Sequence, residues 1–387
     1  MEPIRIGFLS PYSGIYPYYA QHLITGWFLG MGLEPTRQNK IAFIPAFTKQ
    51  GGPSSVTEAV QKLLFFDKVD ILSGLISYKS TPDLIPMVDM HQRMGFFFDM
   101  GEYIPNFPHI SPNMFYASHQ LWQSEYALGY WAQKSYGEGG LIVMPIYEAG
   151  YHLNSAFQRG AAAAGATSFS LKVLPSNYRN SPDNDGIATF LENTAQMAPS
   201  YIHAIFTGKE GTEFLEKWKQ SSLHKSIPLL ITETMAYDDI LEDITNLDMT
   251  VYSANTWNRK SENKINQAFV TKFESLAKQR ANIYALMGYE AGLVWKELLP
   301  FAEKRDWSTV KNRLQQTVIN GPRGEKGFYP ASGLGLPEIS IERIKISGNK
   351  INKLIVDQRK GIAFNHAELE EIHATSVSGW LNPFLCV

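Results

Sequence analysis

The sequence predicts an α/β protein built on parallel sheets with helices on both faces. Short apolar runs alternate with helical patterns from the N-terminus to about Val318, which is the order that βαβ units produce. Each run is rich in Ile, Val, Leu or Phe, as expected of strands that are buried on both sides. At 387 residues the chain exceeds the size at which a single core keeps growing, so we expect two domains.

Strands are predicted wherever such an apolar run is short and bounded by turn residues. In chain order the predicted strands cover Ile4 to Leu9, Ile41 to Pro45, Val69 to Gly74, Gly95 to Phe98, Leu141 to Ile146, Ser170 to Leu174, Ile202 to Thr207, Pro228 to Thr232 and Thr250 to Ala254.

The segments between these runs carry apolar residues at spacings of three and four, which is typical of helices with one face on a core. The helices predicted in this way cover Thr57 to Asp67, Gln120 to Tyr136, Glu210 to Ser221 and Ser261 to Lys278. After Gly321 the pattern becomes rich in turns. Alternating Ile residues then predict a β-hairpin from Ile339 to Val356, with its turn at Ser347 to Asn349.

Composition argues against several classes of protein. The formal net charge is −2 and no run of Lys and Arg suits a phosphate backbone, so we expect no nucleic-acid partner. The single cysteine, Cys386, cannot form an intrachain disulfide. No apolar stretch approaches the roughly 20 residues that span a bilayer. The N-terminus lacks the pattern of a signal peptide, so we expect either a cytoplasmic protein or one whose signal sequence was removed.

Three of the predicted strands run into a polar turn that opens a helix. These turns are Pro11 to Gly14, Ser77 to Ser80 and Asp99 to Glu102. In an open parallel sheet, ligands bind at the carboxyl ends of the strands, where helix N-termini present unpaired N–H groups. The turns are therefore candidates for binding a small polar molecule.

The same turns carry no motif for catalysis or for a cofactor. A dinucleotide site needs glycines in the first turn, where this chain has Tyr12 and Ile15, and no G-x-G-x-x-G or G-x-x-x-x-G-K string follows a strand. No serine stands in a G-x-S-x-G elbow, and we find no pattern of metal ligands. We therefore predict no catalytic residue, no cofactor and no metal site.

Several short strings occur in a specific order along nearly the whole chain. They are Pro11 to Gly14, Ser73 to Thr81, Ser111-Pro112-Asn113 with Phe115, Tyr147 to Tyr151, Thr232-Glu233-Thr234, Tyr289-Glu290-Ala291 and Gly321-Pro322-Arg323-Gly324. Their order and spacing resemble the type I periplasmic binding protein fold, specifically the branched-chain amino acid, amide and urea receptors of ABC transport systems.

The resemblance implies two doubly wound parallel-sheet lobes joined by three crossing strands, with a ligand cleft between the lobes. The crossings are expected near Tyr116 to His119, Tyr252 to Trp257 and Phe328 to Leu334. The N-terminal lobe then comprises residues 1–117 and 256–328, and the C-terminal lobe comprises residues 118–255 and 329–387.

The polar turns and the resemblance together suggest ligand-binding residues in both lobes. The expected residues are Tyr12, Ser13, Ser77, Tyr78, Asp99, Gly101, Glu102, Tyr147, Tyr151 and Glu233. The resemblance implies that Ser77 and Tyr78 present a hydroxyl and backbone N–H groups. It also implies that Tyr147 or Tyr151 covers the ligand and that Glu233 pairs with the ammonium group of an amino acid.

Asp99 and Glu102 depart from the amino-acid receptors of this type, which place small hydroxyl or backbone donors at that turn. Two carboxylates there would repel a ligand carboxylate in a poorly solvated cleft. Burying an unpaired charge costs several kcal/mol, so either these acids point away or the ligand is neutral or cationic at this point. We hypothesise a small polar ligand with an amine, an amide or another N–H donor.

Taken together, we expect a receptor without enzymatic activity that binds an amino acid, amide or amine-bearing compound by closing its lobes. It delivers this ligand to the membrane permease of an ABC importer and is periplasmic or anchored outside the cytoplasmic membrane. The alternative is a cytoplasmic ligand sensor of the amide-receptor type that acts on a regulatory partner protein.

Overall fold

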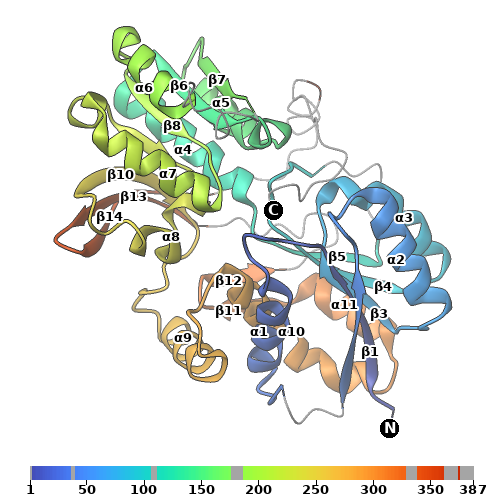
Figure 1. The fold of residues 1–387 in the computed structure, drawn as a ribbon. Helices are drawn as coiled ribbons and strands as arrows, with labels where there is room; N and C mark the ends of the chain where they lie inside the picture. The colour runs from blue at the N-terminus through green and yellow to red at the C-terminus, as the bar shows by residue number, and fades with distance from the viewer. Residues whose placement is uncertain are drawn as a thin grey trace.

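The computed structural model describes residues 2–35, 40–105, 111–175, 186–327, 338–360 and 374. These residues form two lobes, seen in Figure 1 as a group of blue and orange elements and a group of green, yellow and red elements. The predicted fold class, mixed α/β with parallel sheets in two lobes, is confirmed. Among the helices of the described residues, none is both long enough and apolar enough to cross a membrane.

The N-terminal lobe is built on a sheet of five parallel strands in the order β2-β1-β3-β4-β5. The strands are β1 (Ile4–Ser10), β2 (Ile41–Phe47), β3 (Ile71–Leu75), β4 (Met94–Asp99) and β5 (Met114–Ser118). The helices of this lobe are α1 (Tyr19–Met31), α2 (Pro53–Phe65), α3 (Thr81–Met90), α9 (Lys264–Ala277), α10 (Ile283–Ala302) and α11 (Trp307–Gln316). A short hairpin, β11 (Val318–Gly321) and β12 (Gly324–Gly327), follows α11.

The C-terminal lobe is built on a seven-stranded sheet in the order β14-β13-β10-β9-β8-β6-β7. Its parallel strands are β6 (Gly140–Pro145), β7 (Ser170–Leu174), β8 (Tyr201–Ala204), β9 (Leu229–Ile231) and β10 (Met249–Asn255). The predicted hairpin is present as β13 (Glu338–Ser347) and β14 (Lys350–Lys360), with β13 antiparallel to β10. The helices are α4 (Leu121–Tyr136), α5 (Leu153–Ala163), α6 (Gly186–Met197), α7 (Gly208–Gln220) and α8 (Asp238–Glu242).

The chain passes between the lobes at the ends of two strands. β5 belongs to the first sheet and ends at Ser118, whereas α4 begins at Leu121 and packs on β10 and β13 of the second sheet. The chain returns after Asn255, because α9 packs on α1. The third predicted crossing, residues 328–334, lies outside the described residues. The lobe boundaries at 117/118, 255/256 and 328/329 stay predictions.

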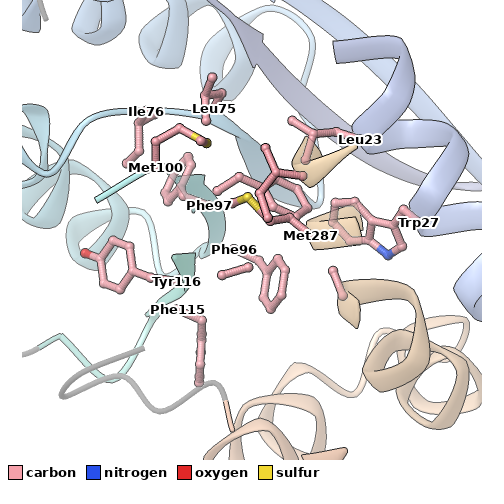
Figure 2. Packing of buried hydrophobic residues seen from close by; sticks show 14 of the residues in the cluster. Leu23, Trp27, Leu75, Ile76, Phe96, Phe97, Met100, Phe115, Tyr116 and Met287 are labelled. Carbon is pink, nitrogen blue, oxygen red and sulfur yellow. The ribbon is translucent and has the colours of Figure 1, made fainter. Parts of the chain in front are cut away.

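The core of the N-terminal lobe joins segments from both ends of the chain. Trp27 of α1 is fully buried and its ring lies 5.5 Å from that of Phe96 and 5.8 Å from that of Trp295, between ring centroids. Figure 2 shows Trp27 beside Phe96 of β4 and Met287 of α10. Through Trp27, α1 packs against both the sheet and α10, and this packing positions the turn that precedes α1.

Glycines allow α1 and α10 to approach with their backbones nearly in contact. A Cβ atom on Gly30 would lie 2.1 Å from the carbonyl oxygen of Tyr289, and one on Gly288 would lie 2.0 Å from that of Leu23. Such distances are far below van der Waals contact, so neither position accepts a side chain unless the helices separate.

We expect Gly30→Ala to lower the free energy of unfolding by about 1–3 kcal/mol, the usual effect of overpacking. Gln21→Ala, on the exposed side of the same helix, is the matched control and should change it by no more than about 0.5 kcal/mol. Urea unfolding followed by circular dichroism measures both. Equal midpoints for Gly30→Ala and the unmodified protein would show that the helices are not in close contact.

Candidate functional site

A cavity of about 390 Å³ lies between the lobes, at the carboxyl ends of the strands of both sheets. From the N-terminal lobe it is lined by residues at or after the ends of β1, β3 and β4, at the start of α1, and from the end of α9 to the start of α10: Pro11, Tyr12, Ser13, Ile15, Tyr16, Tyr19, Leu75, Met100, Glu102 and residues 279–284. From the C-terminal lobe and its connections it is lined by Leu121, Glu148, Tyr151, Leu153, Thr207, Gly208, Thr234, residues 236–240, Asn255, Trp257, Arg259 and Lys353. A volume of this size suits a small organic molecule.

Several residues predicted from the sequence line this cavity, namely Tyr12, Ser13, Glu102 and Tyr151. Tyr12 and Ser13 belong to the turn after β1, in which the Ser13 hydroxyl accepts a hydrogen bond from the Tyr16 N–H at 2.9 Å. Tyr151 comes from the opposite lobe, where it follows a short 3₁₀ turn, Glu148–Gly150. The structure therefore brings these predicted residues together from both lobes.

Other predicted residues do not line the cavity but fix the loops that do. Asp99 is buried and accepts hydrogen bonds from the Tyr78 backbone N–H at 3.1 Å and from the Ser118 hydroxyl at 3.0 Å. Burial, followed by the nearby charge of Glu102, raises the pKa of Asp99 well above its usual range. Ser77 caps the short turn after β3. Contact between ligand and Ser77, Tyr78 or Asp99 stays a prediction.

Gly101 and Tyr147 also have structural contacts in this region. Gly101 has a φ of +78°, and a Cβ atom there would lie 2.4 Å from the Cα of Gln120, so only glycine fits. The Tyr147 hydroxyl donates to the Glu210 carboxylate. Neither residue is among those that line the cavity, and their contact with ligand stays a prediction.

The loop after β4 docks on the loop after β6, which joins the lobes at one side of the cavity. The His152 backbone N–H donates to the Glu102 carbonyl at 2.9 Å, and the Ile104 N–H donates to the His152 Nδ1 at 3.2 Å. The Tyr103 ring packs edge-on against Tyr151, 5.5 Å away between centroids. Glu102 and Glu148, one from each lobe, flank this docking and both line the cavity.

Both of these carboxyl groups are held in a poorly solvated position. Glu102 is 7% exposed and Glu148 is 2% exposed. Burial raises the pKa of Glu102 to about 7 and that of Glu148 to about 8. The Thr207 hydroxyl donates to Glu148 at 2.5 Å and opposes part of this shift.

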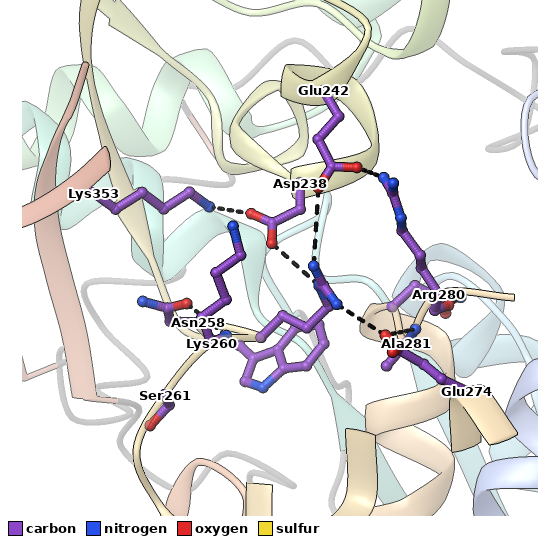
Figure 3. Close-up of polar contacts among 12 residues, drawn as sticks. Asp238, Glu242, Asn258, Lys260, Ser261, Glu274, Arg280, Ala281 and Lys353 are labelled. Atoms are coloured by element: carbon purple, nitrogen blue, oxygen red, sulfur yellow. Dashed lines mark hydrogen bonds and ion pairs between the residues drawn. The ribbon is translucent and has the colours of Figure 1, made fainter. Parts of the chain in front are cut away.

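The positive groups that line the cavity are paired with acids. Lys353 points at Asp238 in Figure 3 and lies 3.0 Å from its carboxylate. Arg259 lies 3.2 Å from the same carboxylate. Arg259 also contacts Glu274 of α9 at 2.9 Å, and Arg280 pairs with Glu242 of α8. Since α8 belongs to the C-terminal lobe and α9 to the N-terminal lobe, this cluster of ion pairs bridges the lobes at the cavity.

His119, between β5 and α4, connects the first passage of the chain to both lobes. Its Nδ1 lies 3.1 Å from Arg323 of the hairpin turn, so it accepts and the proton is on Nε2. The Nε2 lies 3.3 Å from the Glu233 carboxylate and 3.0 Å from the Tyr237 hydroxyl. Burial lowers the pKa of His119, which favours this neutral form. Tyr237 also lines the cavity, so the network reaches the candidate site.

The carboxylate of Glu233 is engaged within this network. It accepts from the Ser124 hydroxyl at 2.5 Å and from the Thr256 backbone N–H at 3.0 Å, in addition to its contact with His119. Glu233 does not line the cavity, although Thr234 does. Its predicted pairing with a ligand ammonium group stays a prediction.

Sequence reasoning did not select Tyr237, Arg259, Arg280 and Tyr284, which line the cavity. Tyr237 and Arg259 follow the predicted strands at Pro228 to Thr232 and Thr250 to Ala254, so the rule that ligands bind after strands could have found them. Arg280 lies between α9 and α10 and Tyr284 lies in the first turn of α10, and no sequence signal places this part of the chain beside the cleft.

The fold is shared with known proteins. A family model described as periplasmic binding protein matches residues 3–347. A solute-binding protein of an ABC transporter from R. palustris, solved in complex with benzoate, has a TM-score of 0.74 at 18% identity, over 94% of this chain and 98% of that one. An ABC transporter substrate-binding protein from Sphaerobacter thermophilus has a TM-score of 0.76 at 20% identity, over 93% and 98%.

A leucine-binding protein from Thermotoga maritima is also similar, with a TM-score of 0.66 at 12% identity over 91% of this chain and 97% of that one. Comparison of the sequence with curated proteins gave no match. At these identities the solved structures establish the shared fold, and the chemistry of the site has to be read from this chain.

The buried Glu148 predicts a pH dependence of stability. Above its ordinary pKa of 4.5 the unfolded chain loses this proton, whereas the folded protein keeps it until about pH 8. The free energy of unfolding therefore falls as pH rises through this window, by up to ~1.4 kcal/mol per pH unit for one group. Urea unfolding at several pH values measures the slope. Glu148→Gln should flatten it, and an unchanged slope would contradict the shift.

The pair of Arg323 and Glu290 predicts a large cost for removing one partner. Burial alone raises the pKa of Glu290, but Arg323 and Lys326 outweigh it and bring the pKa to about 2. Glu290→Gln should destabilise the protein by about 3–5 kcal/mol, because it leaves a buried guanidinium unpaired. Glu303→Gln, which breaks a surface pair with Lys40, is the control and should cost about 0–1 kcal/mol. Similar unfolding midpoints for the two variants would contradict this.

Proposed function

Because this chain belongs to the periplasmic binding protein family, we propose that it is a receptor that captures a small solute between its lobes and does not transform it. The cavity between the lobes is the observation that carries this proposal, since it is lined by residues from loops of both sheets. A solute there contacts both halves of the molecule at once, so it binds the closed arrangement better than an open one. If the ligand binds the closed form about 5.5 kcal/mol more tightly than the open form, it shifts the ratio of closed to open molecules from 1:99 to 99:1.

The groups that line the cavity favour a ligand with N–H donors, such as an amine, an amide or an amino acid. Arg259, Arg280 and Lys353 are each paired with an acid of the protein. Glu102 and Glu148 have no such cationic partner among the described residues. A ligand that donates hydrogen bonds to these carboxyl groups satisfies the site, and charge-assisted bonds of about 1.5–3 kcal/mol each supply the energy of closure.

The transport role includes a membrane permease as partner and a location outside the cytoplasmic membrane. It is supported by the family and by the ABC transporter solute-binding proteins that share the fold. In this role the closed, loaded receptor is the form that the permease recognises, and the ligand leaves unchanged.

A ligand screen with two readouts tests the receptor function. Amino acids, amides, amines and aromatic acids are added in excess, and the melting temperature and the radius of gyration from X-ray scattering are measured. A true ligand at 100 times its Kd should stabilise the protein by ~2.7 kcal/mol and reduce the radius of gyration. Mass spectrometry of the recovered ligand is the control. Turnover of the compound, or no shift with any member of the panel, would contradict the proposal.

A further inference from the structure

Two buried acids from opposite lobes line the cavity, and neither forms an ion pair with a cation in the part of the chain that the structure describes. Glu102 follows β4 of the N-terminal lobe and Glu148 follows β6 of the C-terminal lobe. Among the described residues, neither oxygen of the Glu102 carboxylate accepts a hydrogen bond of good geometry, although the Ser77 hydroxyl lies close enough to lower its pKa in part, and only 7% of the residue is exposed. Such a group is costly unless a partner arrives from outside the protein.

We propose that Glu102 and Glu148 together bind one ammonium group, and that the ligand is an organic amine that carries an apolar or aromatic body and no carboxylate. This inference rests on the proposed receptor function and narrows its ligand class. One cation between the two carboxyl groups attaches to both lobes, so it is bound fully only when the loops after β4 and β6 are docked as they are here.

The cavity has no free cation for a ligand carboxylate among the described residues, because each of its lining Arg and Lys residues is already paired with an acid of the protein. Asp238 lies between Arg259 and Lys353, and Glu242 pairs with Arg280, so a carboxylate would have to displace an existing acid. An ammonium group displaces nothing at Glu102 and Glu148. The ammonium group of a zwitterionic amino acid would bind favourably at Glu102 and Glu148, whereas its carboxylate would find no unpaired cation.

The electrostatic state of the two acids agrees with this assignment. Burial is the largest cause of the raised pKa values of both groups, and the charge of Glu102 is one of the causes for Glu148. A bound cation reverses this effect, because an opposite charge at close range favours the ionised carboxylate. One ammonium group can donate a charge-assisted hydrogen bond to each of the two carboxylates, so both acids gain a partner.

The walls beside the two acids suit an apolar body. Leu75 and Met100 lie near Glu102 in the N-terminal lobe, and Leu153 follows Glu148 in the C-terminal lobe; all line the cavity. Tyr151, three residues after Glu148, also lines the cavity, and aromatic rings are common partners of bound cations. The site thus combines an anionic point with an apolar surface, which is the pattern that an aryl-alkyl amine fits.

Four compounds of similar size test the inference: 2-phenylethylamine, 2-phenylethanol, 3-phenylpropionate and phenylalanine. Titration calorimetry should show the amine binding at least tenfold more tightly than the other three. Glu102→Gln and Glu148→Gln should each weaken the amine at least tenfold, because a neutral amide cannot replace a charge-assisted bond. Glu58→Gln, at an exposed position of α2 outside the cavity, is the matched control and should bind like the unmodified protein.

Circular dichroism and melting curves establish that each variant is folded before binding is compared. Tighter binding of 3-phenylpropionate or phenylalanine than of the amine would overturn the inference, and so would amine binding that neither variant weakens. Failure of the amine to bind also overturns it. The receptor function is judged separately, by the wider panel and the scattering measurement.

Discussion

The buried pairing of Arg323 with Glu290 is the interaction on which the relation between the lobes depends. Arg323 donates to both oxygens of Glu290 at 2.9 Å and 2.6 Å, and a third N–H reaches His119 where the chain first leaves the N-terminal lobe. His119 in turn contacts Glu233 and Tyr237 of the C-terminal lobe. Because an unpaired charge in this position costs several kcal/mol, these connections form as a set and fix the place where the lobes join.

Two further contacts between the lobes surround the cavity at other points. The loop after β4 docks on His152. The ion pairs of Arg259 join α8 to α9, and Arg280, which follows α9, pairs with Glu242 of α8. The His119 network is buried, whereas the Arg259 cluster is partly exposed and therefore screened by salt. The contacts around the cavity thus differ in strength. The buried His119 network lies where the chain crosses between the lobes, and the more weakly held Arg259 cluster lies where the lobes face each other.

The fold and the ligand chemistry come from different parts of the sequence. Solved proteins that share this architecture include a solute-binding protein in complex with benzoate, at 18% identity to this chain, and a leucine-binding protein, at 12% identity. Buried strands and close helix contacts, such as that of Gly30 with Tyr289, keep the architecture. The turns at the strand ends are free to change their polar groups, and here they carry Glu102 and Glu148.

The alternation of apolar runs and helical patterns was enough to predict the α/β class and most of the strands, because both depend on local periodicity. The two lobes were expected from the length of the chain and from its family resemblance. The polar turns after β1 and β4 likewise identified Tyr12, Ser13 and Glu102, which line the cavity. The sequence does not show where a side chain points, so Asp99, Glu102 and Glu233 were all predicted to bind ligand. In the structure, Asp99 and Glu233 accept hydrogen bonds from Ser118 and Ser124 of the protein itself. Only the tertiary structure brings Arg280 and Tyr284 to the cavity and places Glu102 and Glu148 in its lining, because these positions follow from how the lobes meet.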